Sequence, residues 1–168
     1  MKKTLLIICS LFFVSTLILG TAFGATEAPQ PQPGASLASL QLYDLQGHQF
    51  TMSEVKTGRV VVIFWAFWCD TWKKALPSIQ ELTAEQQDLD CTVLTVSVDG
   101  RYTEEIRPLV NAGKIPFPVL LDDGSWTKQL GLRRVPTVVV LDQQRKVVWL
   151  REAYPGNAKL KDAIRAMK

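Results

Sequence analysis

Hydrophobic residues fall along this chain in runs and periodic patterns that predict alternating strands and helices. Two nearly continuous apolar runs, at 60–67 and 92–98, are rich in β-branched residues. Such runs are typical of strands that are covered on both faces of a sheet. Between them, apolar residues recur at helical spacing over 69–88, which predicts a helix with a kink at Pro77.

The rest of the chain continues this alternation and closes it with paired strands. Two short segments at 40–44 and 49–51, separated by a turn at Gly47, predict a hairpin near the start of the domain. Further helices are predicted at 104–112, 126–130 and 158–167, and further strands at 117–121, 137–141 and 147–150. This order predicts an α/β fold, with a central mixed sheet flanked by helices and an N-terminal β-hairpin.

The amino terminus has the pattern of an export signal. It begins with two lysines, continues as a long apolar stretch and ends at Gly24 in a small-x-small sequence. Residues 1–24 are therefore predicted to be a secretory signal that is cleaved before Ala25, which predicts a periplasmic or otherwise exported protein. The alternative is an uncleaved signal that anchors the protein in a membrane. Residues 25–36 predict a Pro/Gln-rich spacer, followed by a folded domain at 37–168.

The charge balance changes once the predicted signal is removed. The full chain has 19 basic and 16 acidic residues and a formal net charge of +3. Two lysines leave with the signal, so the mature protein keeps 17 basic against 16 acidic residues. This balance gives no indication of binding to nucleic acid or to an anionic membrane surface, and we expect neither as a partner.

Of the three cysteines, Cys9 lies inside the predicted signal, which leaves Cys69 and Cys91. Cys69 follows the strand at 60–67 and begins the next helix, where unpaired backbone N–H groups and the helix dipole favour a thiolate. A thiolate at this position would be a nucleophile. The alternative is an inert, buried thiol.

Cys91 stands at the start of the second buried strand. If the two strands are parallel, Cys91 lies at the opposite edge of the sheet, roughly 20 Å from Cys69. A disulfide requires Cα atoms within about 7 Å of each other. Cys91 is therefore predicted to be a structural thiol in the core and not a partner of Cys69.

Trp72 occupies the position where a C-x-x-C redox motif would have its second cysteine. Indole cannot resolve a mixed disulfide, so one thiol would have to act alone. Trp68 and Trp72 flank the predicted helix start, where we expect partial exposure and a binding surface, while Trp65 is expected in the core. Arg133 and Arg134 are expected near the same rim, where they would stabilise a thiolate or attract an acidic partner. The alternative is that they lie in a solvated loop.

The sequence gives no set of residues for a metal or a cofactor. His48 is the only histidine and lies in the predicted hairpin turn. Two distant cysteines and one remote histidine cannot supply the three or four convergent ligands of a metal site. We therefore expect neither a metal nor an organic cofactor.

Four short segments carry a resemblance to a known family. They are FWAFWCDTW at 64–72, VSVD at 96–99, FPV at 117–119 and RVPT at 134–137. In this order they resemble the thioredoxin-like proteins of the TlpA/ResA type, which are exported thiol–disulfide reductases active in redox homeostasis. The resemblance covers about 37–168 and implies a thioredoxin-like fold.

The resemblance also implies roles for individual residues and reveals departures from the family pattern. Val135 and Pro136 match the cis-proline loop that faces the active cysteine, where a cis bond exposes the backbone of Val135 to an extended substrate peptide. Trp72 replaces the resolving cysteine. The acidic residue that such proteins usually carry two positions before the helix proline is Ala75 here.

Two functions remain open for this chain. The first is an exported oxidoreductase with a monothiol mechanism, in which Cys69 is catalytic and an external thiol releases the adduct. Its substrate contacts would come from Trp68, Trp72, Val135 and Pro136, and its thiolate environment from Asp70, Thr71 and Arg134. Its partners would be protein or small-molecule thiols and disulfides, with an external reductant. The alternative is a redox-inactive thioredoxin-fold module that binds a peptide or protein through the aromatic rim and the proline loop.

Overall fold

The computed structural model describes residues 34–39, 41–100 and 103–166, so the predicted signal and most of the predicted spacer lie outside the described residues. The described residues form a seven-stranded sheet in the order β2-β1-β5-β4-β3-β6-β7. The strands are β1 (Gln41–Asp44), β2 (Gln49–Thr51), β3 (Arg59–Trp65), β4 (Cys91–Ser97), β5 (Val119–Leu121), β6 (Thr137–Leu141) and β7 (Val147–Glu152). The helices are α1 (Asp70–Ala84), α2 (Thr103–Asn111), α3 (Ser125–Leu130) and α4 (Asn157–Ala166), with a 3₁₀ turn η1 (Met52–Glu54) after β2.

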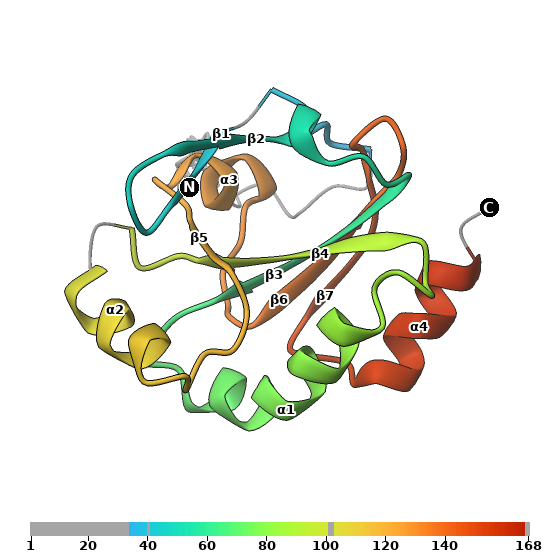
Figure 1. Ribbon diagram of the computed structural model, residues 1–168. Coiled ribbons are helices and arrows are strands. Elements are labelled where there is room, and N and C mark those ends of the chain that lie inside the picture. Colours follow the sequence, from blue (N-terminus) through green and yellow to red (C-terminus); the bar gives the residue numbers. More distant parts are fainter. Residues whose placement is uncertain (1–33, 40, 101–102, 167–168) are drawn as a thin grey trace, which may run out of the picture.

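Helices cover both faces of this sheet. In Figure 1, α1, α2 and α4 lie below the central strands and α3 lies above them. Successive side chains of a strand point to opposite faces, so Val61 and Trp65 of β3 join the cluster that contains residues of α1, α2 and α4. Val62 and Phe64 join the second cluster, which contains residues of α3. The predicted α/β architecture with an N-terminal hairpin is confirmed.

The central strands bring three chain segments to one edge of the sheet. β3 and β4 are parallel, with Arg59 opposite Cys91 and Trp65 opposite Ser97. β6 runs antiparallel to β3, with Thr137 opposite Phe64. The carboxyl ends of β3 and β4 and the amino end of β6 therefore meet at the same edge, which we call the carboxyl edge.

The predicted elements differ from the observed ones mainly at their ends. The strand predicted at 60–67 ends at Trp65, because Ala66 and the next residues turn away from the sheet. The Cys69 N–H closes this turn by donating to the Ala66 carbonyl oxygen at 3.1 Å. The helix predicted at 69–88 spans Asp70–Ala84, with Pro77 inside it.

The chain enters the domain at the edge of the sheet opposite the carboxyl edge. The Gly34 N–H donates to the Val147 carbonyl at 2.8 Å, and Ser36 forms an isolated bridge with Lys146, the residue before β7. The last residues of the predicted spacer therefore pair with the sheet. Among the residues that the structure describes, no helix is both long enough and apolar enough to span a membrane.

Candidate thiol site at the carboxyl edge

Cys69 lies at the point where β3 gives way to α1. It is the N-cap residue of α1, with extended backbone angles (φ −84°, ψ 111°), and it is half-buried. Its side chain makes no capping hydrogen bond to the helix. The first-turn N–H groups of a helix have no partner within that helix, so Cys69 lies at the positive end of the helix dipole.

The Cys69 side chain faces the loop before β6. The peptide bond between Val135 and Pro136 is cis. The Cys69 Sγ–H donates to the Val135 carbonyl oxygen, with 3.4 Å between sulfur and oxygen. This loop is held from two sides, because the Ala153 N–H donates to the Pro136 carbonyl at 2.8 Å and the Thr137 hydroxyl donates to the Arg134 carbonyl at 2.6 Å. The thiol therefore lies against a fixed segment of backbone.

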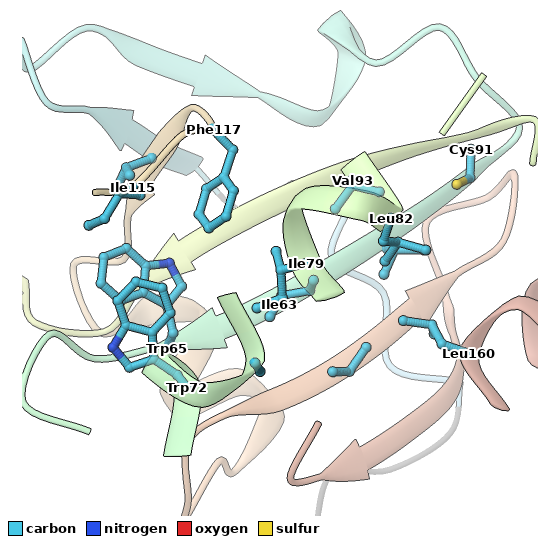
Figure 2. Packing of buried hydrophobic residues seen from close by; sticks show 14 of the residues in the cluster. Ile63, Trp65, Trp72, Ile79, Leu82, Cys91, Val93, Ile115, Phe117 and Leu160 are labelled. Carbon is cyan, nitrogen blue, oxygen red and sulfur yellow. The ribbon is translucent and has the colours of Figure 1, made fainter. Parts of the chain in front are cut away.

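Trp72 is not part of an exposed rim, so the prediction that it would be partly exposed is wrong. Its side chain is only 1% exposed and packs on Trp65, with ring centroids 4.0 Å apart and an interplanar angle of 33°. Figure 2 shows the two indoles side by side at one end of the hydrophobic cluster. The reason is the helical spacing: Trp72 begins the stripe that continues with Ala75, Ile79 and Leu82, all of which are buried against the sheet.

Trp68 is exposed as predicted, with 63% of its surface accessible. It borders a groove of about 220 Å³ beside the proline loop. The residues that line the groove are Trp68, Val98, Thr127, Leu132, Arg133, Arg134 and Val135. Cys69 is not among the lining residues, but Val135 joins the two features, because its carbonyl receives the Cys69 thiol.

The three residues expected around the thiolate make contacts elsewhere or are exposed. The Asp70 carboxylate pairs with Lys73 Nζ at 3.0 Å, and the Arg134 Nε lies 3.9 Å from the Glu152 carboxylate. Thr71 is exposed. Their influence on the Cys69 sulfur therefore stays a prediction.

Asp99 is a residue at this edge for which sequence reasoning assigned no role. Its buried carboxylate accepts hydrogen bonds from the Phe67 N–H at 2.8 Å and from the Ser97 hydroxyl at 2.7 Å. It thereby ties the turn that carries Cys69 to the end of β4. An aspartate directly after a buried strand is the signal in the sequence, since a buried carboxylate needs hydrogen-bond donors close by.

Cys91 lies at the far end of the same core, as predicted. It is the first residue of β4, opposite Arg59, and is 2% exposed. Figure 2 shows it at the opposite end of the cluster from the two tryptophans. Both described cysteines are free thiols. Burial raises the pKa of the Cys91 thiol to about 11; the Arg59 charge opposes this rise and the Asp90 carboxylate adds to it.

This raised pKa predicts a specific loss of stability in alkaline solution. An unfolded cysteine ionises near pH 8.5, whereas folded Cys91 stays neutral until about pH 11. The neutral thiol thus favours the folded state fully below about pH 8.5, and this contribution disappears as the pH rises through 11. In urea unfolding between pH 8 and 11, the free energy of unfolding of Cys91→Ala should fall by about 2–3 kcal/mol less than that of the wild type. If the free energy of unfolding fell equally with pH in the two proteins, the raised pKa of Cys91 would be contradicted.

The remaining candidate for metal binding is remote from the thiol. His48 lies after the turn between β1 and β2, where its Nδ1 pairs with the Asp44 carboxylate at 2.9 Å and its side chain is largely exposed. Within the part of the chain that the structure describes, no group of three or more His, Cys, Asp and Glu side chains is arranged to hold a metal ion.

Comparisons with known proteins place this chain in a family. The model of the AhpC/TSA family matches residues 33–150. The thiol-disulfide oxidoreductase ResA of Bacillus thuringiensis is 26% identical over 140 residues, which cover 79% of this chain and 80% of that protein. The thioredoxin-like protein YneN of Bacillus subtilis is 24% identical over 114 residues, or 67% of each chain.

A solved structure extends the similarity to the fold. The pneumococcal exposed lipoprotein thioredoxin Etrx1 from Streptococcus pneumoniae superposes with a TM-score of 0.63 and 27% sequence identity, covering 76% of this chain and 98% of that one. The predicted thioredoxin-like fold is thereby confirmed, and the distant homologues include thiol–disulfide oxidoreductases. The chain belongs to the AhpC/TSA family of thioredoxin-like proteins.

Proposed function

We propose that this protein is an exported thiol–disulfide exchange protein that acts through Cys69 alone. The observation that carries the proposal is the position of the Cys69 sulfur, at the N-cap of α1 and 3.4 Å from the Val135 carbonyl of the cis-proline loop. Cys69 is half-buried at a helix start, where the first N–H groups have no partner within the helix, and a groove of about 220 Å³ lies along the Val135 loop that its sulfur contacts. Both features favour a nucleophile over an inert core thiol.

The exchange proceeds in two steps that need no net change in the oxidation state of the protein. The Cys69 thiolate attacks one sulfur of a substrate disulfide, forming a Cys69–substrate disulfide while the other substrate sulfur leaves as a thiolate and takes up a proton. An external thiol, such as a small cellular thiol or a cysteine of another protein, then attacks the adduct. This second step transfers the substrate sulfur to the external thiol as a new disulfide and regenerates the Cys69 thiolate.

The surroundings of Cys69 support release by an outside thiol. Trp72 fills the position of a resolving cysteine, and its indole is buried against Trp65. Cys91 lies at the other edge of the sheet, paired with Arg59. Cys69 and Cys91, the two described thiols, are thus too far apart for Cys91 to attack an adduct on Cys69. The adduct would persist until a thiol arrives from solution.

The proline loop and Trp68 would hold the substrate. The backbone of Val135 beside a cis-proline can pair with an extended peptide as an added strand, and the exposed indole of Trp68 offers an apolar contact next to it. Export would depend on the predicted signal at 1–24, with membrane attachment only if that signal is retained. The similarity to an exposed lipoprotein thioredoxin is in keeping with a site outside the cytoplasm.

The release step provides the test of the monothiol mechanism. The Cys69–glutathione adduct should form when the protein is mixed with oxidised glutathione, and it should persist after the reagent is removed. Its decay, followed by intact mass, should then be first order in the concentration of added thiol. Decay at a rate that does not depend on the added thiol would show that a second thiol of this protein resolves the adduct, which would overturn the proposal.

The exposed indole and the groove also support the second function, a binding module without redox activity. The two functions differ in what they require of the sulfur. A binding module would hold its peptide equally well with Cys69→Ser, whereas the exchange protein would lose all covalent capture. Peptide binding that is undiminished in Cys69→Ser but lost in Trp68→Ala would favour the binding module.

A further inference from the structure

An apolar groove lies at the carboxyl edge, along the proline loop that the Cys69 sulfur contacts. Its apolar wall consists of Trp68, Val98, Leu132 and Val135, and Val135 is the residue whose carbonyl receives the Cys69 thiol. Trp68 is a large hydrophobic side chain left 63% exposed at the mouth of this groove. An exposed indole beside an apolar groove is a feature of binding surfaces, where an aromatic anchor contributes much of the contact energy.

The charged residues of the groove all have one sign. Arg133 and Arg134 line it, both with exposed side chains, and no acidic residue is among its lining residues. Arg134 faces Glu152 at 3.9 Å, which is the outer limit of an ion pair between exposed groups. The mature chain as a whole carries nearly equal numbers of basic and acidic residues, so this concentration of positive charge is local.

The first turns of α1 add one positive charge at this end of the domain, that of the exposed Lys74. The neighbouring Lys73 is also exposed, but its charge is balanced by Asp70, with which it pairs at 3.0 Å. A carboxylate-bearing molecule that enters the groove would therefore meet the two arginines of its lining, and no acidic residue of that lining would repel it. Charge complementarity of this kind mainly raises association rates and selects between partners.

We propose that the groove selects substrate polypeptides in which acidic residues flank the reactive cysteine. This inference rests on the proposed exchange function of Cys69. The substrate segment lies extended along the Val135 backbone, with an apolar side chain against Trp68 and a carboxylate beside Arg133 and Arg134. Arginine is suited to this role because its planar guanidinium binds a carboxylate through two parallel hydrogen bonds.

Matched disulfide peptides test the selection directly. Each peptide is extended, contains one cysteine with an apolar neighbour and carries two flanking residues that are either both Glu or both Gln. Its cysteine is joined to 2-thiopyridine, so attack by Cys69 forms the Cys69–peptide disulfide and releases 2-thiopyridone, whose absorbance reports the rate. With the wild-type protein at low salt, the Glu peptide should react about three- to tenfold faster than the Gln peptide.

Variants assign this preference to the groove. Arg133→Gln and Arg134→Gln should each reduce the preference for the Glu peptide, and the double variant should bring it close to unity. Arg165→Gln, an exposed arginine in the last turn of α4, is the matched control and should keep the preference. Trp68→Ala should slow both peptides by a similar factor, and added salt should reduce the Glu preference only.

The outcomes separate this inference from the function on which it rests. Equal rates for the two peptides, or a preference that survives the double arginine variant, would overturn the acidic selection while leaving exchange by Cys69 intact. A failure of both peptides to release 2-thiopyridone would instead contradict the exchange function. All three arginines are exposed, so their substitution should leave the fold intact. If the double variant is nevertheless unstable, the two single variants measure the same loss of preference for the Glu peptide.

Discussion

Cys69→Ser is expected to abolish thiol–disulfide exchange completely. Serine keeps the size of the side chain, its N-cap position at α1 and its place beside the Val135 carbonyl, but its hydroxyl cannot form a mixed disulfide. The serine hydroxyl is moreover an N-cap side chain that helices favour, so the folded state should be kept or slightly stabilised. The measurement is the rate of exchange with a disulfide peptide in the presence of an external thiol, together with the urea midpoint.

The matched control is Cys91→Ala. Cys91 is buried at the opposite end of β4, so its removal should leave the exchange rate unchanged and lower the stability modestly. The same pair of variants also separates redox activity from integrity of the fold. Residual exchange by Cys69→Ser, or loss of exchange by Cys91→Ala at full folding, would contradict the assignment of Cys69 as the nucleophile.

Trp72→Ala is expected to destabilise the domain by about 3–5 kcal/mol, the usual cost of removing a buried tryptophan. The indole is 1% exposed and stacked on Trp65, so its removal leaves a large cavity between α1 and β3. Because the free energy of unfolding of a small domain is only about 5–15 kcal/mol, this one substitution should remove a large part of it. Urea unfolding at neutral pH, followed by circular dichroism, measures the effect.

Trp68→Ala is the control for this prediction, since it removes the same side chain from an exposed position four residues earlier. With 63% of its surface accessible, Trp68 should contribute no more than about 1 kcal/mol to stability. Its substitution should instead slow the reaction with peptide substrates. Equal loss of stability in both variants would mean that the two indoles do not have the different environments described above.

Most of the fold could be predicted from the sequence, because hydrophobic patterns record burial directly. The runs at 60–67 and 92–98 are buried on both faces as β3 and β4, and their parallel pairing places Cys91 away from Cys69 as expected. The position of Cys69 could also be predicted, since a thiol between a strand and a helix must lie at an edge of the sheet.

The orientation of Trp72 was the main error, and its cause is physical. Trp72 was expected to share the exposure of its neighbour Trp68, but the two are separated by the turn that starts α1. Once the helix begins at Asp70, the spacing of Trp72 to Ala75 and Ile79 places all three on the face toward the sheet. That stripe is visible in the sequence when the helix start is known.

The role of Asp99 was not predictable from local patterns. Its carboxylate bonds to the Phe67 N–H, and this contact joins residues that are distant along the chain. Only the parallel register of β3 and β4 brings them together at one edge. Tertiary hydrogen bonds of this kind leave no periodic signal, although a buried aspartate after a strand indicates that some donor must be near.

Intact-mass analysis with peptide mapping, after incubation of the native protein with oxidised glutathione, tests the central claim most directly. We expect one glutathione on the peptide that contains Cys69, an unmodified Cys91, and complete removal of the adduct by a small external thiol. An unmodified Cys69, an adduct on Cys91, or a disulfide between the two cysteines would contradict the account.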